Sequence, residues 1–167
     1  RLDPGNPYWT WTLAALDRIR TAGAGRFLAG IPDRIEGLDV LSELLGTETL
    51  LTALVDCPEE IHRLLGELDR LYWEAFNPLY ERVRDDRDGN AFIAFQIWGP
   101  GRTLKSQCDF SAMISPDMFA EFVCPSLERQ CAQADFSVYH LDGVKALPHL
   151  EHLLRVKSLT AIQWTPG

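Results

Sequence analysis

Short apolar stretches alternate with amphipathic helical patterns at least three times along this chain of 167 residues. The apolar stretches at 26–30, 91–98, 136–141 and 159–163 have the length of strands, and the segments between most of them are long enough to contain a helix. Parallel neighbours in a sheet need such long crossovers, whereas antiparallel neighbours do not. The order therefore predicts an α/β fold with a parallel sheet and helices packed outside it.

Proline and capping residues indicate where two of the helices begin. Pro58 stands at a first helical position, two glutamates follow it near the positive end of the helix dipole, and the amphipathic pattern continues to Val83. Ser115 followed by Pro116 is the same kind of start, with the serine as the N-cap. Pro125 lacks a backbone N–H, so we expect it to interrupt the second of these helices.

The composition and charge of the chain argue against some classes of function. An apolar fraction of 46% is enough for one hydrophobic core, and we treat residues 1–167 as a single domain. The formal charge of −8 argues against nucleic-acid binding, which requires clustered Lys and Arg. No apolar run approaches the roughly 20 residues that cross a bilayer, and the first residues do not resemble a signal peptide. We expect a cytoplasmic protein with no membrane or nucleic-acid partner.

The cysteines and three of the four histidines give no sign of a site. There is no CxxC pair, and Cys124 and Cys131 would lie about 10 Å apart along one helix, too far for a disulfide. We expect all four cysteines to be reduced. His62, His149 and His152 fall on the expected outer faces of helices, and we expect them to be exposed to solvent.

Polar side chains stand where expected strands end, and these are the candidate catalytic residues. His140 and Asp142 are two residues apart on one strand and therefore project from the same face. An imidazole beside a carboxylate suits proton transfer, and it also suits binding of a divalent metal. Alternatively, the two side chains bond each other and close the turn at Gly143. Asp109 follows another strand, where it could act in catalysis or cap the next helix.

Five further residues are candidates for binding a substrate. Gln163 and Trp164 end the last expected strand. The amide of Gln163 could bind a carbonyl or carboxyl group of a ligand, and the indole of Trp164 could provide a flat surface against which the ligand packs. Trp98 ends its own strand, although such aromatic residues are more often packing residues. Arg34 and Arg102 lie in neighbouring loops and could bind an anion, or they could be solvated.

Three segments resemble the uroporphyrinogen decarboxylase superfamily, which includes the cobamide-dependent methyltransferases. They are Cys108 to Pro125, Tyr139 to Gly143, and Ala161 to Gly167, and the resemblance covers roughly the last 140 residues. It implies a (β/α)8 TIM barrel, of which this chain would form about half, because a complete barrel takes about 250 residues. We expect an excerpt of a longer protein whose outer strands are covered by further chain or by a second copy, and hence a homo-oligomer.

The methyltransferase branch has a His-x-Cys-Gly zinc motif at the place of His140-Leu-Asp-Gly143. A carboxylate here replaces the thiolate, which makes a zinc ion at His140 and Asp142 a harder Lewis acid. The resemblance implies methyl transfer to or from a corrinoid, with a small-molecule substrate, a corrinoid protein as partner, and a third metal ligand outside this chain. This is the function that we expect.

Two alternatives remain open. In the decarboxylase branch an Asp-Gly pair matches Asp142-Gly143, and decarboxylation of a tetrapyrrole would need no metal or cofactor. Against it, Leu38 occupies the place of a substrate-binding tyrosine, and Asp109 replaces a serine and would repel substrate carboxylates. The other alternative is a barrel without catalysis that binds a small acid or a tetrapyrrole.

Overall fold

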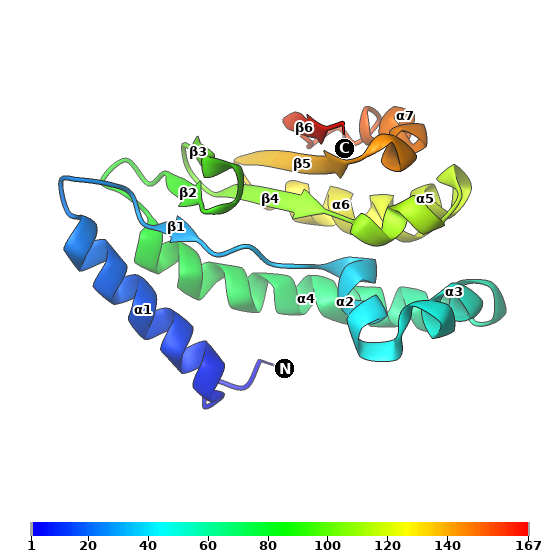
Figure 1. Cartoon of the computed structure of the whole chain (residues 1–167), viewed down its shortest axis with the longest axis horizontal. Helices are drawn as coiled ribbons and strands as arrows, with labels where there is room; N and C mark the ends of the chain where they lie inside the picture. Colours follow the sequence, from blue (N-terminus) through cyan, green and yellow to red (C-terminus); the bar gives the residue numbers. More distant parts are fainter. Residues whose placement is uncertain (1, 167) are drawn as a thin grey trace. The chain divides into compact units, whose positions relative to one another are not determined.

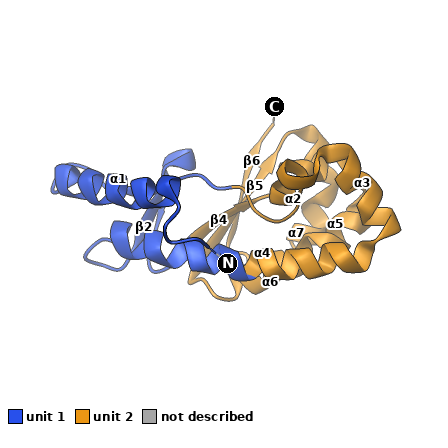
Figure 2. Ribbon diagram, turned by 90° about the horizontal axis from the view of Figure 1, so that it is seen from below, with its two compact units in different colours: residues 1–34, 70–103 blue, residues 35–69, 104–167 orange. Residues whose placement is uncertain are grey.

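The computed structural model describes residues 2–166, which form a mixed α/β structure with two compact units (Figure 2). The first unit comprises residues 1–34 and 70–103, and the second comprises residues 35–69 and 104–167. Helix α4 (Pro58–Val83) contributes its first part to the second unit and its last part to the first. Its bounds confirm the helix that was expected from Pro58 to Val83.

The first unit combines two helical segments with a small sheet. Helix α1 (Pro7–Gly23) begins at Asn6, whose side chain accepts hydrogen bonds from the N–H groups of Tyr8 and Trp9. The sheet has the order β1 (Gly30–Ile31), β2 (Asn90–Phe92) and β3 (Trp98–Gly99), and α4 supplies much of the buried core. The core residues of α4 in this unit are Tyr72, Phe76, Leu79, Tyr80 and Val83.

The single strand expected over 91–98 is wrong. Strand β2 ends at Phe92, a 3-10 turn η1 (Ala94–Gln96) follows, and β3 returns antiparallel to β2. Phe95 and Gln96 both have positive φ angles, of 60° and 51°, which no strand can contain. Residues 91–98 have the apolar composition of one strand, but the chain reverses its direction between β2 and β3.

The second unit contains a three-stranded sheet in the order β4 (Thr103–Gln107), β5 (Phe136–Asp142) and β6 (Ala161–Thr165), as Figure 1 shows. Strands β5 and β6 are parallel, with His140 paired to Gln163 and Asp142 paired to Thr165. The crossover between them contains η3 (Val144–His149) and α7 (Leu150–Leu153). This part agrees with the expected parallel sheet.

Helices cover one face of this sheet. Helix α5 (Pro116–Phe122) starts with Ser115, whose hydroxyl accepts a hydrogen bond from the N–H of Met118, and α6 (Cys124–Cys131) starts anew around Pro125. The interruption expected at Pro125 is thus confirmed. The remaining helical elements are α2 (Gly37–Leu45), α3 (Thr47–Asp56) and the 3-10 turn η2 (Asp109–Met113). The buried side chains of this unit include Leu104, Phe119, Phe122, Tyr139 and Leu141.

Candidate functional site

Strand alternation separates the β4–β5–β6 sheet into an apolar face and a polar face. Tyr139 on β5 packs edge-on against Phe119 of α5, and the Ser106 hydroxyl on β4 donates to the Glu36 carboxylate at the start of α2, so these residues face the helices. Their neighbours along each strand must project from the opposite side. We call that side the polar face. Its polar residues are Lys105, Gln107, His140, Asp142, Gln163 and Thr165, and the apolar Phe136, Val138 and Ala161 project from the same side.

His140 lies in the middle strand of the polar face and is held by Gln163 of the neighbouring strand. The Nδ1 of His140 and the Oε1 of Gln163 form a hydrogen bond, and the Gln163 Nε2 donates to Thr165 Oγ1 at 3.1 Å. An amide oxygen can only accept, so Nδ1 donates the proton of this hydrogen bond. This orientation suits His140 for accepting a proton from a ligand on the polar face.

Gln163, and not Asp142, is therefore the side chain that orients the imidazole. Residues two apart on a strand are separated by about 6.6 Å, whereas directly paired residues on adjacent strands are about 4.8 Å apart. His140 and Gln163 are such a pair. The Asp142 side chain is exposed and forms no hydrogen bond or ion pair with any residue in 2–166.

Asp109 is connected to the polar face through β4. The Gln107 Nε2 donates a hydrogen bond to the Asp109 carboxylate at 3.2 Å, and the Lys105 Nζ donates to the Oε1 of Gln107. Lys105 is only 4% exposed, which is unusual for a lysine. Sequence reasoning missed Lys105 and Gln107, although their alternation with Leu104 and Ser106 is the pattern of a strand with one polar face.

The backbone at Asp109 is fixed by Asp39 from helix α2. The Asp39 carboxylate accepts hydrogen bonds from the N–H groups of Asp109, at 3.0 Å, and Phe110, at 2.8 Å. Burial raises the pKa of Asp39 despite these hydrogen bonds, which act in the other direction. Asp39 thus holds the start of η2, while the side chain of Asp109 points to Gln107.

Trp164 does not share a face with Gln163. It is paired with Leu141, which is buried on the apolar face, and its own side chain is 47% exposed. Because successive residues of a strand alternate, the indole of Trp164 and the amide of Gln163 cannot line one pocket on the polar face. The sequence had placed the two together because both end the same strand.

Trp98 belongs to the first unit, where its side chain contacts the turn between α4 and β2. Its Nε1 donates to the Asp85 carboxylate at 3.0 Å, and Arg87 lies 5.2 Å above the ring. Burial of Asp85 is outweighed by hydrogen bonds from Gly89, Arg87 and Trp98, which hold its pKa below the usual value. The contacts of Trp98 are those of a packing residue.

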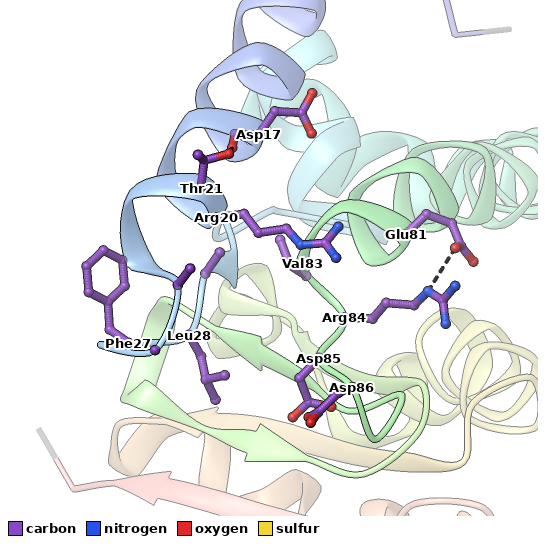
Figure 3. A pocket seen from close by; sticks show the side chains of 13 residues that line it. Asp17, Arg20, Thr21, Phe27, Leu28, Glu81, Val83, Arg84, Asp85 and Asp86 are labelled. Atoms are coloured by element: carbon purple, nitrogen blue, oxygen red, sulfur yellow. Dashed lines mark hydrogen bonds and ion pairs between the residues drawn. The ribbon is translucent and has the colours of Figure 1, made fainter.

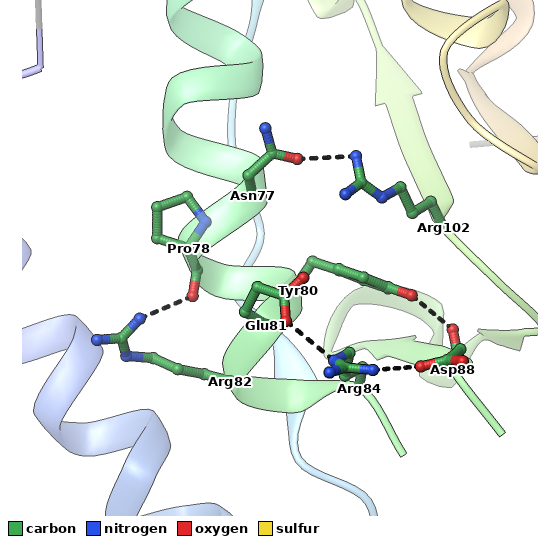
Figure 4. A network of polar contacts seen from close by, with 8 residues as sticks. All are labelled: Asn77, Pro78, Tyr80, Glu81, Arg82, Arg84, Asp88 and Arg102. Atoms are coloured by element: carbon green, nitrogen blue, oxygen red, sulfur yellow. Dashed lines mark hydrogen bonds and ion pairs between the residues drawn. The ribbon is translucent and has the colours of Figure 1, made fainter. Parts of the chain in front are cut away.

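Arg34 and Arg102 also belong to the first unit, and both guanidinium groups lie over aromatic rings of α4. Arg34 is 4.5 Å from the ring centre of Tyr72, and Arg102 is 5.3 Å from that of Tyr80. Arg102 further donates to Asn77 Oδ1 at 3.1 Å (Figure 4). Through these cation–π contacts, both side chains contribute to the packing of the first unit.

A wide pocket of about 790 Å³ lies in the first unit between the ends of α1 and α4 (Figure 3). Three of its charged groups, Glu81, Arg84 and Asp85, are bound to each other or to the backbone. Arg84 pairs with Glu81 at 3.0 Å and with Asp88, and Asp85 accepts from the N–H of Gly89 at 2.9 Å. These groups fasten the end of α4 to the following turn, as Figure 4 shows, and do not converge on one point in the pocket.

His149 is buried, so the expectation that it is solvated is wrong. It is 1% exposed, its ring stacks on Phe119 with centres 4.4 Å apart, and its Nε2 donates to the Ser111 carbonyl at 2.8 Å. Burial lowers the pKa of His149, so the neutral ring is favoured. His62 and His152, in contrast, are at least partly exposed. All four cysteines are free thiols, as expected.

The residues of the polar face do not form a zinc site by themselves. A structural or catalytic zinc ion needs three or four protein ligands, and His140 and Asp142 supply two. Residues 2–166 contain no group of three or more His, Cys, Asp or Glu side chains placed to hold a metal ion. Zinc would therefore require ligands beyond these.

None of the helices in residues 2–166 combines the length and the apolar character needed to cross a bilayer. No family model, curated protein or solved structure matches the chain.

Proposed function

We propose that this chain forms about half of an α/β barrel of the uroporphyrinogen decarboxylase and cobamide-dependent methyltransferase superfamily, and that the polar face lines its substrate cavity. Two features support the proposal. Strands β4, β5 and β6 are neighbours in chain order, and helices cover one face of their sheet while polar side chains gather on the other. Barrel enzymes of this type place catalytic residues at the carboxyl ends of strands.

The observation that carries the proposal is the hydrogen bond between His140 and Gln163. It holds the ring through Nδ1 and so orients the imidazole on the polar face. In a methyl transfer from a corrinoid, the attacking substrate must lose its proton as the methyl group is transferred, and His140 would take that proton. Gln163 would act by holding the ring, and Asp142 and Asp109 would interact with cationic or hydroxyl groups of the substrate.

Decarboxylation of a tetrapyrrole is the second candidate, and Lys105 favours it. The lysine places an ammonium group on the same face as His140, where it could interact with a substrate carboxylate. Asp109 works against this reaction by repelling the same carboxylates, which is why methyl transfer comes first.

The test compares the two reactions in the same preparation. The full-length protein with the complete barrel is incubated with methylcobalamin and a thiol, and loss of the methyl–cobalt absorption is followed; a second incubation contains uroporphyrinogen. For methyl transfer we expect turnover that falls about 100-fold in His140→Ala and about tenfold in Gln163→Ala, with His152→Ala as the control that keeps full activity. Unchanged turnover in His140→Ala would contradict the proposal, and binding without turnover would favour a non-catalytic barrel.

A further inference from the structure

The polar side chains of the polar face gather at the carboxyl ends of its strands. On β5 and β6 the first residues that project from this face are apolar, namely Phe136, Val138 and Ala161. The polar residues follow them, and Asp142 is paired directly with Thr165. Gln107 is likewise the last residue of β4. A ligand on this face therefore meets its polar partners at one end of the sheet.

At the end of β4, the side chains of Gln107 and Asp109 place a donor beside an acceptor. The Oε1 of Gln107 accepts from Lys105, and one N–H of its Nε2 donates to Asp109 Oδ2 at 3.2 Å. An amide group has two N–H donors, and a carboxylate can accept about four hydrogen bonds. Within residues 2–166 the second N–H of Gln107 has no acceptor, and the Asp109 side chain is exposed. Both groups are thus available to one ligand atom.

Asp142 and Thr165 form a second pair of this kind. The Thr165 Oγ1 accepts from Gln163 Nε2 at 3.1 Å, and none of the residues 2–166 accepts the proton of this hydroxyl. The Cα atoms of directly paired residues on adjacent strands are about 4.8 Å apart, so the exposed carboxylate of Asp142 lies beside the Thr165 hydroxyl. The hydrogen bond from His140 holds the Gln163 amide in the orientation that this arrangement needs.

A hydroxyl group is the ligand group that satisfies such a pair. Its oxygen accepts from the N–H of Gln107 while its proton is donated to Asp109. A carboxylate can only accept, and the negative charge of Asp109 would repel it. An ammonium group can only donate, so it would leave the N–H of Gln107 without an acceptor. Lys105 and Asp109 also carry opposite charges at the two ends of one hydrogen-bond chain, which favours a neutral ligand.

We propose that the carboxyl end of the polar face binds a neutral polyhydroxylated molecule of the sugar or polyol class. One hydroxyl bridges Gln107 and Asp109, and another bridges Thr165 and Asp142. This assignment rests on the proposed substrate cavity, because it names the substrate class of that cavity, but it does not depend on methyl transfer. A molecule with a single hydroxyl satisfies only one pair, and it should bind at least about tenfold more weakly.

The test uses four probes that share a six-membered ring, namely myo-inositol, cyclohexanol, cyclohexanecarboxylate and cyclohexylamine. Each is titrated, up to about 100 mM, into the full-length protein with nitrogen-labelled glutamine, and the side-chain amide signals are followed by NMR. We expect myo-inositol to shift the signals of Gln107 and Gln163 with saturation, and cyclohexanol to bind at least about tenfold more weakly. Shifts of Gln107 caused by the carboxylate or the amine, and none by myo-inositol, would overturn the proposal.

Two variants remove the donors. Gln107→Glu replaces the N–H with an oxygen, and Thr165→Val removes the hydroxyl while keeping the shape of the side chain. Each should weaken binding of myo-inositol at least about tenfold. The matched control is Gln133→Glu, at an exposed glutamine outside the polar face, which should bind as the parent does. Unchanged binding in both donor variants, with circular dichroism like that of the parent, would reject this site.

The outcome also separates this inference from the proposed reaction. Binding of myo-inositol that depends on Gln107 and Thr165, without methyl transfer, would support the site and contradict the reaction. Methyl transfer that depends on His140, without any binding of myo-inositol, would support the reaction and contradict the site.

Discussion

His149 is a buried neutral histidine that couples the stability of the second unit to pH. Its ring is packed on Phe119 and donates to the Ser111 carbonyl, and burial lowers its pKa from the reference value of 6.5. The unfolded chain therefore binds a proton more readily than the folded one. The contribution of His149 to stability is complete above pH 6.5 and is lost as the pH falls from there toward the lowered value in the folded state.

We predict that the free energy of unfolding decreases between pH 7 and pH 5, and that His149→Gln reduces this decrease. Glutamine can still donate to the Ser111 carbonyl but does not titrate in this range. Urea denaturation at several pH values measures the effect, with His152→Gln as the control that should retain the parent's dependence. An unchanged dependence in His149→Gln would show that another group is responsible.

Asp39 has a structural role that its position in the sequence did not indicate. We predict that Asp39→Ala destabilises the chain by about 1–3 kcal/mol, because the N–H groups of Asp109 and Phe110 both lose their acceptor. Asp39→Asn keeps one acceptor oxygen and should cost clearly less. Chemical denaturation of both variants provides the comparison, and equal losses in the two would contradict this account of η2.

At the scale of elements, the turn between α4 and β2 depends on the absence of a side chain at Gly89. A Cβ at this position would lie 2.5 Å from Trp98 Cζ2 and 2.8 Å from the carbonyl oxygen of Gly99. We predict that Gly89→Ala costs about 1–3 kcal/mol and lowers the melting temperature. The control is Gly66→Ala within α4, where a Cβ meets nothing within 4 Å and should stabilise the helix by about 0.5–1 kcal/mol. Equal effects would contradict the crowding at Trp98.

Helix boundaries could be predicted from the sequence better than strands. Pro58, Ser115 and Pro125 act through local chemistry, namely capping and the missing N–H of proline, and the helices begin or break where these residues stand. The stretch 91–98 had the composition of one strand, but positive φ angles at Phe95 and Gln96 turn it into a hairpin. Neither residue type signals such a turn, so the reversal could not be read from the sequence.

At the scale of the whole molecule, the sequence placed residues on the faces of strands more accurately than it assigned the contacts between strands. Period-two alternation correctly placed His140 and Asp142 on one face, but the partner of His140 depends on the register between β5 and β6. Register arises from tertiary packing, so Gln163 could not be recognised as that partner. The burial of His149 and Lys105 likewise depends on which elements pack against them.

We propose that the substrate binds to the polar face of the β4–β5–β6 sheet at His140. The most direct test is a nitrogen–proton NMR spectrum of the chain with labelled histidine rings, recorded before and after addition of methylcobalamin. We predict that the signals of His140 shift, while those of His149, on the apolar side, and of His62 and His152 stay in place. Binding of methylcobalamin that leaves the His140 signals unchanged would contradict the account.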